Sequence, residues 1–526
     1  MALTLSVPAS TQALPKGIET KSKQAKAWVE SLPLTKTAET ARALLEHITT
    51  LNRSKMSADE RFELLETYRP VVLTLLEELE HVFAYSTLPL PTKQREAFEL
   101  ARGLAAECAI AYKLLIVDKA GKLIAFGAKK SMPLPLHRAL QYTGRTLNQA
   151  FKTYYPAPAG AWRDLHQLYA FAEEQGLLGE IVEPESKASL LDIYCEPILL
   201  SLADPYRLMY READKVLELM VQYRGTVSLS SQRPESIDPA KVFIVALDSD
   251  RAPRLMSIAI KDPPGQVLRL LDLTKLVEKL KQRIQALANN RDAANRSKAS
   301  HDTTDLLARL LKLWGDPPKR QFRRNPSDTG VVLCSGIKAI AHFANLSLRE
   351  DTSAQAAAIQ DGSTMPLLRI PDDPVSKALG VEEWTVLNQS ANGLRLHREP
   401  GGSVGVTVGE AIGVRFAGGQ AWNIGVVRWL NVLENNDLEF GVELIAPSAQ
   451  PIEIEPTISN NSKVQPALRL PSMLAEGESE TLLTYPDTFS DLREFELNDG
   501  SVRTLIRATS LIEKTSRFEI FQFNPS

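Results

Sequence analysis

The chain has 526 residues, of which 44% are hydrophobic and 24% are charged, and its formal net charge is −3. At about 150 residues per domain, this length predicts three or four domains, each large enough to bury a core of its own. The near-neutral charge excludes a general nucleic-acid coat, so any anion site must come from local clustering of basic residues.

The N-terminal part of the chain is predicted to be helical. Residues 1–20 contain proline, serine and threonine without periodicity, which indicates a flexible arm. From residue 21 to 224, apolar residues recur at helical spacing, and Ser57-Ala58-Asp59-Glu60 has the form of a capping box. Short breaks with proline and glycine separate the helical runs, and no fixed internal period is present. We therefore predict an all-α helical bundle for residues 21–224.

The pattern changes to mixed α and β near residue 225. Three short stretches rich in β-branched residues, the last of them at 255–260, predict strands. Apolar residues after Asp272, which could cap a helix, and again at 306–314 predict two helices. A polar stretch at 289–300 between them indicates a loop. Residues 225–315 are therefore predicted to form a small α/β unit, or else strands and helices that pack on the N-terminal bundle.

Residues 316–447 contain short strand-like runs separated by turns, which is typical of a small antiparallel barrel. An Ala-rich and then Gly- and Pro-containing stretch at 344–380 is predicted to be an insertion that loops out of this barrel. The six strands are predicted at 329–334, 384–387, 394–396, 411–416, 422–429 and 438–444.

The last part of the chain is predicted to contain a linker and a second β unit. Residues 448–466 are rich in proline, serine and asparagine, which indicates a linker, and four strand-like runs follow in residues 467–526. The predicted fold class is therefore multidomain α+β. It comprises an N-terminal all-α helical bundle, a small α/β unit, a six-stranded antiparallel barrel and a short C-terminal β unit.

Two short motifs in the barrel region have the chemistry of an anion site. Lys319-Arg320-Gln321-Phe322-Arg323-Arg324 contains an R-x-x-x-R pattern, and flanking prolines keep it out of regular helix. Asn388-Gln389-Ser390-Ala391-Asn392-Gly393 contains N-x-S-x-x-G at a predicted turn. A guanidinium fork matches two phosphate oxygens, or the O6 and N7 acceptors of guanine. Asn388 and Ser390 alternate, so both project toward one face of an extended strand end.

These two motifs, followed by barrel strands, resemble the signatures of the PilZ family of bacterial cyclic di-GMP receptors. Residues 425–429 and 440–444 are similar to the last two strands of that barrel. The resemblance implies that Arg320 and Arg324, helped by Arg323, bind phosphate and guanine. It also implies that Asn388, Ser390 and Gly393 complete the pocket, with Gly393 in a positive-φ turn that lets the backbone approach the ligand. Asparagine stands at 388, where aspartate is commoner in the family, and the insertion lengthens the gap between the motifs.

No other pattern indicates a catalytic or metal site. The seven histidines have no metal-ligand spacing, and no Walker loop or nucleophile motif is present. The three cysteines lie far apart and are predicted to be buried, inert thiols in a reducing compartment. Four tryptophans are predicted to pack in the core or barrel rather than to stack on bases, namely Trp314, Trp384, Trp422 and Trp429. We therefore predict no enzyme activity, no metal and no cofactor besides the ligand.

The terminal and apolar patterns predict a cytoplasmic protein. The N-terminus lacks a signal-peptide pattern, and no apolar stretch approaches the ~20 residues that a transmembrane helix needs. The main hypothesis is a bacterial effector that binds cyclic di-GMP and couples its level to an unknown protein partner through the helical domain, with no nucleic-acid partner. The family resemblance implies control of motility, attachment or exopolysaccharide. The alternative is an adaptor or scaffold whose degenerate PilZ-like barrel binds no nucleotide.

Overall fold

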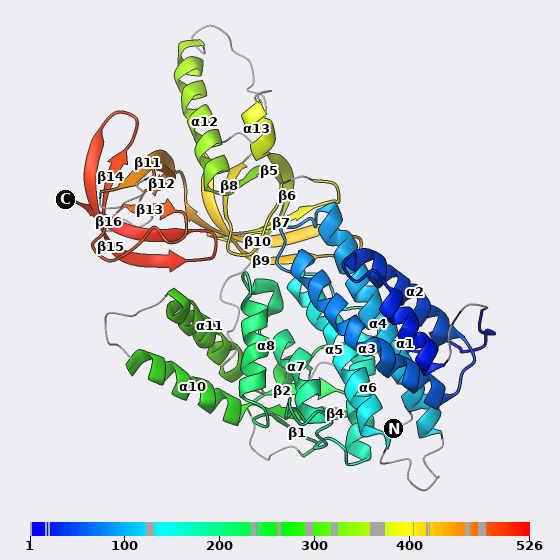
Figure 1. Cartoon of the computed structure of the whole chain (residues 1–526). Coiled ribbons are helices and arrows are strands. Elements are labelled where there is room, and N and C mark those ends of the chain that lie inside the picture. Colours follow the sequence, from blue (N-terminus) through cyan, green and yellow to red (C-terminus); the bar gives the residue numbers. More distant parts are fainter. Residues whose placement is uncertain are drawn as a thin grey trace. The chain divides into compact units, whose positions relative to one another are not determined.

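The chain folds into two compact units of mixed α and β structure, which confirms the predicted multidomain α+β class (Figure 1). The first unit comprises Met1–Ser86, Leu90–Pro205 and Arg211–Arg320, and the second comprises Thr87–Pro89, Tyr206–Tyr210 and Gln321–Ser526. A computed structural model describes residues 3–15, 18, 21–121, 131–232, 238–239, 242–259, 265–289, 298–316, 325–357, 374–402, 404–416, 419, 421–457, 463–471 and 480–526.

The first unit contains the predicted helical bundle. Its capping box forms as expected, because the Glu60 N–H donates to Ser57 Oγ at 3.3 Å while the Ser57 N–H donates to Glu60 Oε2 at 3.1 Å. The apolar stripes of the long helices, with Leu64, Leu76 and Leu104 fully covered, form the core. The helices are α1 (Ser22–Ser31), α2 (Thr37–Arg53), α3 (Ala58–Phe83), α4 (Thr92–Ala120), α5 (Pro133–Lys152), α6 (Ala161–Glu174), α7 (Leu190–Leu202), the 3₁₀ turn η2 (Pro205–Arg207) and α8 (Glu212–Gln222).

The predicted flexible arm is wrong for the part of residues 1–20 that the structure describes. The Thr4 N–H donates to Gln167 Oε1 at 2.6 Å, and the Ser6 N–H donates to Asp164 Oδ1 at 2.9 Å. Leu5, between them, is buried. Side-chain acceptors on α6 therefore satisfy the backbone donors that an irregular segment would otherwise expose to water. These acceptors lie far away in sequence, so local composition does not reveal them.

A small α/β unit follows, as predicted, with a four-stranded sheet in the order β1-β4-β2-β3. Two local predictions are wrong: the strand expected at 255–260 ends at Leu255, where helix α9 begins, and the polar loop is shorter because α11 begins at Lys298. The elements are β1 (Ser228–Ser230), β2 (Phe243–Ala246), β3 (Arg254–Leu255), α9 (Met256–Ala259), β4 (Leu268–Asp272), α10 (Thr274–Asn289) and α11 (Lys298–Gly315).

Polar contacts join this sheet to the helical bundle within the first unit. Asp250 accepts hydrogen bonds from the N–H groups of Gly160 (2.6 Å) and Arg163 (3.0 Å). These N–H groups lie at the start of α6, where they have no acceptor within the helix. Arg269 donates to both oxygens of Glu173 on the same helix, at 3.0 Å from Nε and 2.6 Å from Nη2. The two ends of α6 therefore hold two different parts of the α/β unit.

The second unit begins with the predicted antiparallel barrel, here called the first barrel. All six predicted strands are confirmed, and they close in the order β10-β7-β6-β5-β8-β9. Alternation sets the two faces: Val331 and Leu333 on one face of β5 are buried, and so are Val332 and Cys334 on the other. The strands are β5 (Asn325–Ser335), β6 (Glu382–Gln389), β7 (Gly393–Arg398), β8 (Ala411–Phe416), β9 (Asn423–Val432) and β10 (Leu438–Ala446).

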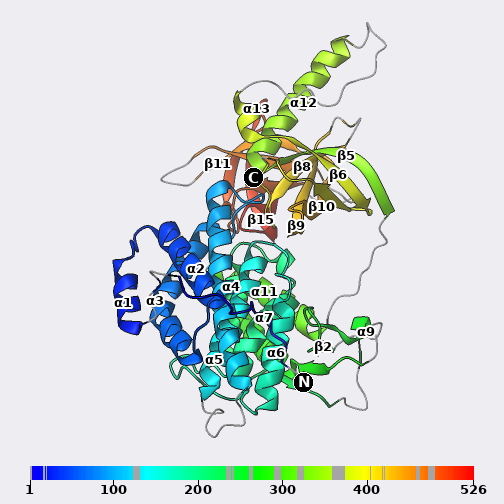
Figure 2. The same cartoon turned by 90° about the vertical axis from the view of Figure 1, so that its right-hand side faces the viewer.

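The described parts of the predicted insertion at 344–380 are helical, and its first residues continue a helix that is packed on the barrel. Helix α12 (Ile337–Ala357) starts directly after β5, and α13 (Pro374–Leu379) precedes β6, while residues 358–373 lie outside the described residues. Ile340 and Phe343 of α12 pack in one cluster with Trp422 and Ile424 of the barrel wall. Figure 2 shows α12 standing on the strands from which it emerges. The first turns of α12 therefore cover an apolar outer surface that a free-standing barrel would expose.

The last six strands close into a second barrel, in the order β11-β12-β13-β16-β15-β14. The predicted linker at 448–466 is wrong, because its residues 450–456 form the first strand, with Ile452 and Ile454 in the barrel interior. The predicted short β unit at 467–526 is therefore the larger part of a complete barrel. Its strands are β11 (Gln450–Pro456), β12 (Gln465–Leu470), β13 (Thr481–Thr484), β14 (Glu494–Asn498), β15 (Arg503–Lys514) and β16 (Glu519–Pro525).

The second barrel is apolar on both sides of three of its strands. Leu482 and Phe521 point into its interior, whereas their neighbours Leu483 and Ile520 join the cluster that contains α12 and the first barrel. Successive residues of a strand face opposite sides, so a strand with both faces apolar must be covered on both. Helix α12 therefore joins the two barrels through one continuous core.

We predict that Phe343→Ala destabilises the barrel unit by about 3–5 kcal/mol, because it leaves a cavity in the core shared by α12 and both barrels. Phe343 is 2% exposed and its ring centroid lies 5.9 Å from that of Trp422. Urea titration of the full chain, followed by tryptophan fluorescence, measures the change. Lys338→Ala, at an exposed position of the same helix, is the control and should shift the midpoint little. Equal midpoints for the two variants would contradict the proposed role of α12.

Candidate functional site

The N-x-S-x-x-G motif lies where β6 turns into β7, and we call residues 388–393 the motif turn. Asn388 and Gln389 are the last two residues of β6, Ser390 lies in the turn, and Gly393 is the first residue of β7. The Ser390 N–H donates to the Gly393 carbonyl at 2.8 Å, and the Leu444 N–H of β10 donates to the Asn392 carbonyl at 2.8 Å. The structure therefore brings the three predicted residues of this motif together at one end of the first barrel.

The expected positive φ at Gly393 is wrong. The backbone there does not enter the left-handed region, unlike that of Gly401 and Gly409 nearby. Glycine is needed for space instead, because a Cβ at 393 would lie 2.9 Å from Ser390 Oγ. The Ser390 hydroxyl also donates weakly to the Gly393 carbonyl at 3.4 Å. The glycine thus lets the serine side chain fold over the start of β7.

The strand ladder between β5 and β6 relates the motif turn to the arginine cluster. Asn325 pairs with Gln389 and Pro326 pairs with Asn388. Arg320, Arg323 and Arg324 lie outside the described residues, which resume at Asn325. Paired residues in an antiparallel ladder have Cα atoms about 4.5–5.5 Å apart. The residue that directly follows the arginine cluster is therefore one strand spacing from the motif.

Asn388 belongs to the outer face of the barrel, together with Arg395 of β7. The two residues are directly paired, and directly paired residues point to the same face of a sheet. Arg395 forms an ion pair with Glu439 on the next strand at 2.5 Å, while its buried Nε has no hydrogen-bond partner among the described residues. Sequence reasoning missed Arg395. The alternation of Leu394 and Leu396 with polar residues is the signal that places it outward.

A second arginine near the motif turn is held by two carboxylates. Arg428 of β9 contacts Glu443 Oε2 at 2.7 Å through Nε and Glu513 Oε2 of the second barrel at 3.0 Å through Nη2. Burial opposes the charged form of Arg428, but the hydrogen bonds and charges of Glu513 and Glu443 outweigh it and raise its pKa. This arginine therefore bridges the barrels rather than offering a free charge to an anion.

Three of the four tryptophans are buried as predicted, and the fourth differs. Trp314, Trp384 and Trp422 are each 2% exposed. Trp429, in contrast, is partly exposed and pairs with Gly441 of β10, which in turn pairs with Arg395. The sequence around residue 429 cannot show whether its tryptophan points into or out of the barrel. A bulge opposite Gly441 shifts the pairing by one residue and so changes the alternation of side chains.

A second R-x-x-x-R pattern shows that this spacing alone does not make an anion site. Arg503 and Arg507 both lie on β15 of the second barrel. Arg503 pairs with Glu496 at 3.1 Å and Arg507 pairs with Glu494 at 2.6 Å, both on the neighbouring strand. This pair is therefore an exposed cross-strand charge ladder, and the position of an R-x-x-x-R pattern beside a suitable turn matters more than its spacing.

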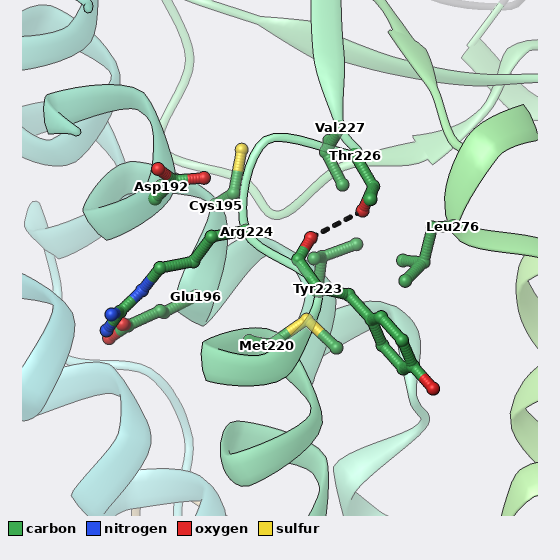
Figure 3. A pocket seen from close by; sticks show the side chains of 10 residues that line it. Asp192, Cys195, Glu196, Met220, Tyr223, Arg224, Thr226, Val227 and Leu276 are labelled. Carbon is green, nitrogen blue, oxygen red and sulfur yellow. Dashed lines mark hydrogen bonds between the residues drawn. The ribbon is translucent and has the colours of Figure 1, made fainter. Parts of the chain in front are cut away.

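The first unit contains a small crevice between α7, α8 and the segment that follows α8 (Figure 3). Cys195 and Met220 provide apolar walls, and Glu196 and Arg224 lie at one end. Burial raises the pKa of Glu196 to about 7, although the nearby Arg224 opposes this shift. The crevice is narrow, and we assign it no ligand.

The described residues contain no group of three or more His, Cys, Asp or Glu side chains placed to hold a metal ion. No helix in the described part of the chain is long and apolar enough to cross a membrane. All three cysteines are buried and free, and burial raises the pKa of each thiol well above its ordinary value. This agrees with the prediction of buried, inert thiols.

Three protein-family models match successive parts of the chain. Residues 23–235 match the N-terminal domain of the cyclic-di-GMP receptor FimW, residues 242–362 and 372–451 match its middle PilZ domain, and residues 453–526 match its C-terminal beta-barrel domain. The curated protein "Cyclic-di-GMP receptor FimW" from Pseudomonas aeruginosa is 27% identical over 546 residues, covering 94% of this chain and 89% of that protein. No solved structure matches the chain. The similarity, expected only for the C-terminal half, thus extends over nearly the whole chain.

We predict that Gly393→Ala destabilises the motif turn, because its Cβ would lie only 2.9 Å from Ser390 Oγ. The expected loss is about 1 kcal/mol, measured as a shift of the thermal unfolding midpoint. The double variant Ser390→Ala/Gly393→Ala removes the clashing oxygen. It should therefore be nearly as stable as Ser390→Ala alone. A double variant that loses as much as the sum of both single variants would exclude this contact as the cause.

We also predict a pH-dependent effect of Glu196→Gln. The native pKa of Glu196, about 7, is above its ordinary value of 4.5, so the native state holds this proton more tightly than the unfolded chain. The stability that this group contributes is therefore complete below pH 4.5 and is lost as pH rises through 7. Relative to the parent, Glu196→Gln should gain roughly 3 kcal/mol between pH 4.5 and 8. Thermal unfolding at several pH values tests this, with the exposed Glu30→Gln as a control that should show no such trend.

Proposed function

Because this chain belongs to the family of PilZ-domain cyclic-di-GMP receptors, we propose that it binds cyclic di-GMP on the first barrel, beside the motif turn. The observation that carries this proposal is the register of β5 with β6. Asn325, the residue after the R-x-x-x-R cluster, pairs with Gln389 in the N-x-S-x-x-G motif. The first described residue after the arginine cluster is therefore paired with the motif turn, despite the long insertion between the two motifs in sequence.

We assign the recognition of phosphate and guanine to Arg320 and Arg324, with Arg323 as an additional donor. Guanidinium forks bind phosphate and the guanine O6/N7 edge through paired, charge-assisted hydrogen bonds. Asn388 and Ser390 supply short polar side chains at the other wall, where an amide or hydroxyl can hydrogen-bond to a guanine edge. Gly393 contributes by leaving room for Ser390, because any side chain at 393 would begin with a Cβ against the serine hydroxyl.

We further propose that the protein is a cytoplasmic effector without catalytic activity, and that the helical domain is the surface for a protein partner. Ligand binding by Arg320 and Arg324 would connect the arginine cluster to the barrel through the ligand, and ligand contacts of this kind are a common way to alter an interface. Cyclic di-GMP is the ligand that we propose, with no other cofactor. The alternative, a scaffold whose barrel binds no nucleotide, is separated from this proposal by a direct binding measurement.

We expect calorimetric titration of the full chain with cyclic di-GMP to show saturable binding that Arg320→Ala/Arg324→Ala weakens by ten- to a hundredfold or more. Each lost bidentate, charge-assisted contact costs roughly 1–3 kcal/mol. Ser390→Ala removes one neutral hydrogen bond and should weaken binding by about fivefold.

The matched control is Arg503→Ala/Arg507→Ala, which removes the R-x-x-x-R pair that is already engaged by Glu496 and Glu494. It lowers the net charge by the same amount and should leave the affinity unchanged. Equal losses in the two double variants would indicate a general charge effect instead of a site. Absence of binding by the parent chain would favour the scaffold alternative.

A further inference from the structure

A row of residues on the outer face of the first barrel connects the motif turn to Trp429. Asn388 pairs with Arg395, Arg395 pairs with Gly441, and Gly441 pairs with Trp429. These pairs cross four strands, β6, β7, β10 and β9, and directly paired side chains share a face. With about 4.8 Å between neighbouring strands, the row spans about 14 Å from Asn388 to Trp429 along the sheet.

The indole of Trp429 lies flat on Gly441. A Cβ at position 441 would lie 1.8 Å from Trp429 Nε1, 2.4 Å from Cε2 and 2.5 Å from Cδ1. A point in the ring plane, 1.8 Å beyond the nitrogen, would lie farther from both neighbouring carbons than these distances, so the point lies above the ring face. One face of the indole therefore covers the glycine, and the opposite face points away from the sheet.

Trp429 makes no polar or aromatic contact within the part of the chain that the structure describes. Trp429 is partly exposed, and no described residue forms a ring stack, a cation–π contact or a hydrogen bond with it. The barrel interior beside it is filled by Leu430, which is fully buried. Packing of the barrel thus explains Leu430 but not the flat, outward tryptophan, which has the form of a stacking platform for a planar ring.

We infer that Trp429 stacks on one guanine of the cyclic dinucleotide, while the motif turn holds the other. This inference rests on the proposed function and adds a ligand-contact residue to it. A cyclic dinucleotide carries two flat purines on opposite sides of its diphosphate ring, so a site needs two separate walls. Arg395 lies between these walls in the row, and its pairing with Glu439 at 2.5 Å holds it in place there. Gly441 is required because any larger side chain would lift the indole from the sheet.

The test is calorimetric titration of the full chain with cyclic di-GMP in four variants and the parent. Trp429→Ala should weaken binding about ten- to a hundredfold, as expected for the loss of one base–aromatic stack. Trp429→Phe, which keeps a smaller aromatic face, should weaken it by less than Trp429→Ala does. Gly441→Ala should weaken binding without changing any atom of the tryptophan, because the new Cβ displaces the ring.

The double variant Trp429→Ala/Gly441→Ala separates this mechanism from general damage to the barrel. If Gly441→Ala acts only through the indole, the double variant binds as well as Trp429→Ala alone; an additional loss would overturn the role given to Gly441. Ligand-induced quenching of tryptophan fluorescence is a second measurement. It should be largely lost in Trp429→Phe and retained in Trp28→Phe, a tryptophan of α1 that stacks on His47.

The outcomes also separate this inference from the proposed function. If the parent binds cyclic di-GMP and Ser390→Ala weakens binding, but Trp429→Ala binds within twofold of the parent, the stacking role is wrong and the proposed function stands. If the parent does not bind, both fail. Thermal unfolding of each variant shows whether a loss of affinity comes from the site or from the fold.

Discussion

The antiparallel ladder between β5 and β6 is the constraint on which the candidate site depends. A ladder sets which residues face each other, and a slip of one residue would turn every side chain to the other face. The register that pairs Val331 with Trp384 and Pro326 with Asn388 buries the apolar residues of both strands and leaves Asn388 outside. The hydrophobic interior of the barrel thus determines the position of the polar motif. The positions of side chains at the proposed site on the outer face are therefore set by buried residues that would not contact the ligand.

The long insertion is compatible with this ladder because its first part is packed rather than loose. α12 leaves β5 at Gly336, which adopts a positive φ of 86°, and places Ile340 and Phe343 on the barrel wall. The helix shields apolar residues of both barrels, so it stabilises the sheet whose register carries the motif. Separating two halves of a site by many residues costs little once they are held by a ladder, because the cost of closing a loop rises only slowly with its length.

The parts of the fold that could be predicted are those with a strong local pattern. The strands of the first barrel are short apolar runs bounded by turn residues, and the long helices have apolar stripes at regular spacing. β11 resembles a linker because Pro451 and Pro456 flank a short Ile-Glu-Ile run, although prolines are tolerated near strand ends and edges. The N-terminal segment resembles a flexible arm because its partners, Gln167 and Asp164, are distant in sequence. Neither error concerns local propensity, since tertiary contacts decide both segments.

The candidate site is only partly predictable for a related reason. A motif can be read from consecutive residues, so the sequence indicates Asn388, Ser390 and Gly393, although the role it suggests for Gly393 is wrong. Arg395, Gly441 and Trp429 come from three different strands and form a row only when the register is known. The bulge opposite Gly441 interrupts the alternation of side chains at Arg428 and Trp429. Arg428 contacts Glu513, and Trp429 lies across the glycine. The proposed binding face is therefore assembled from several strands, and a motif found along one strand marks only one edge of it.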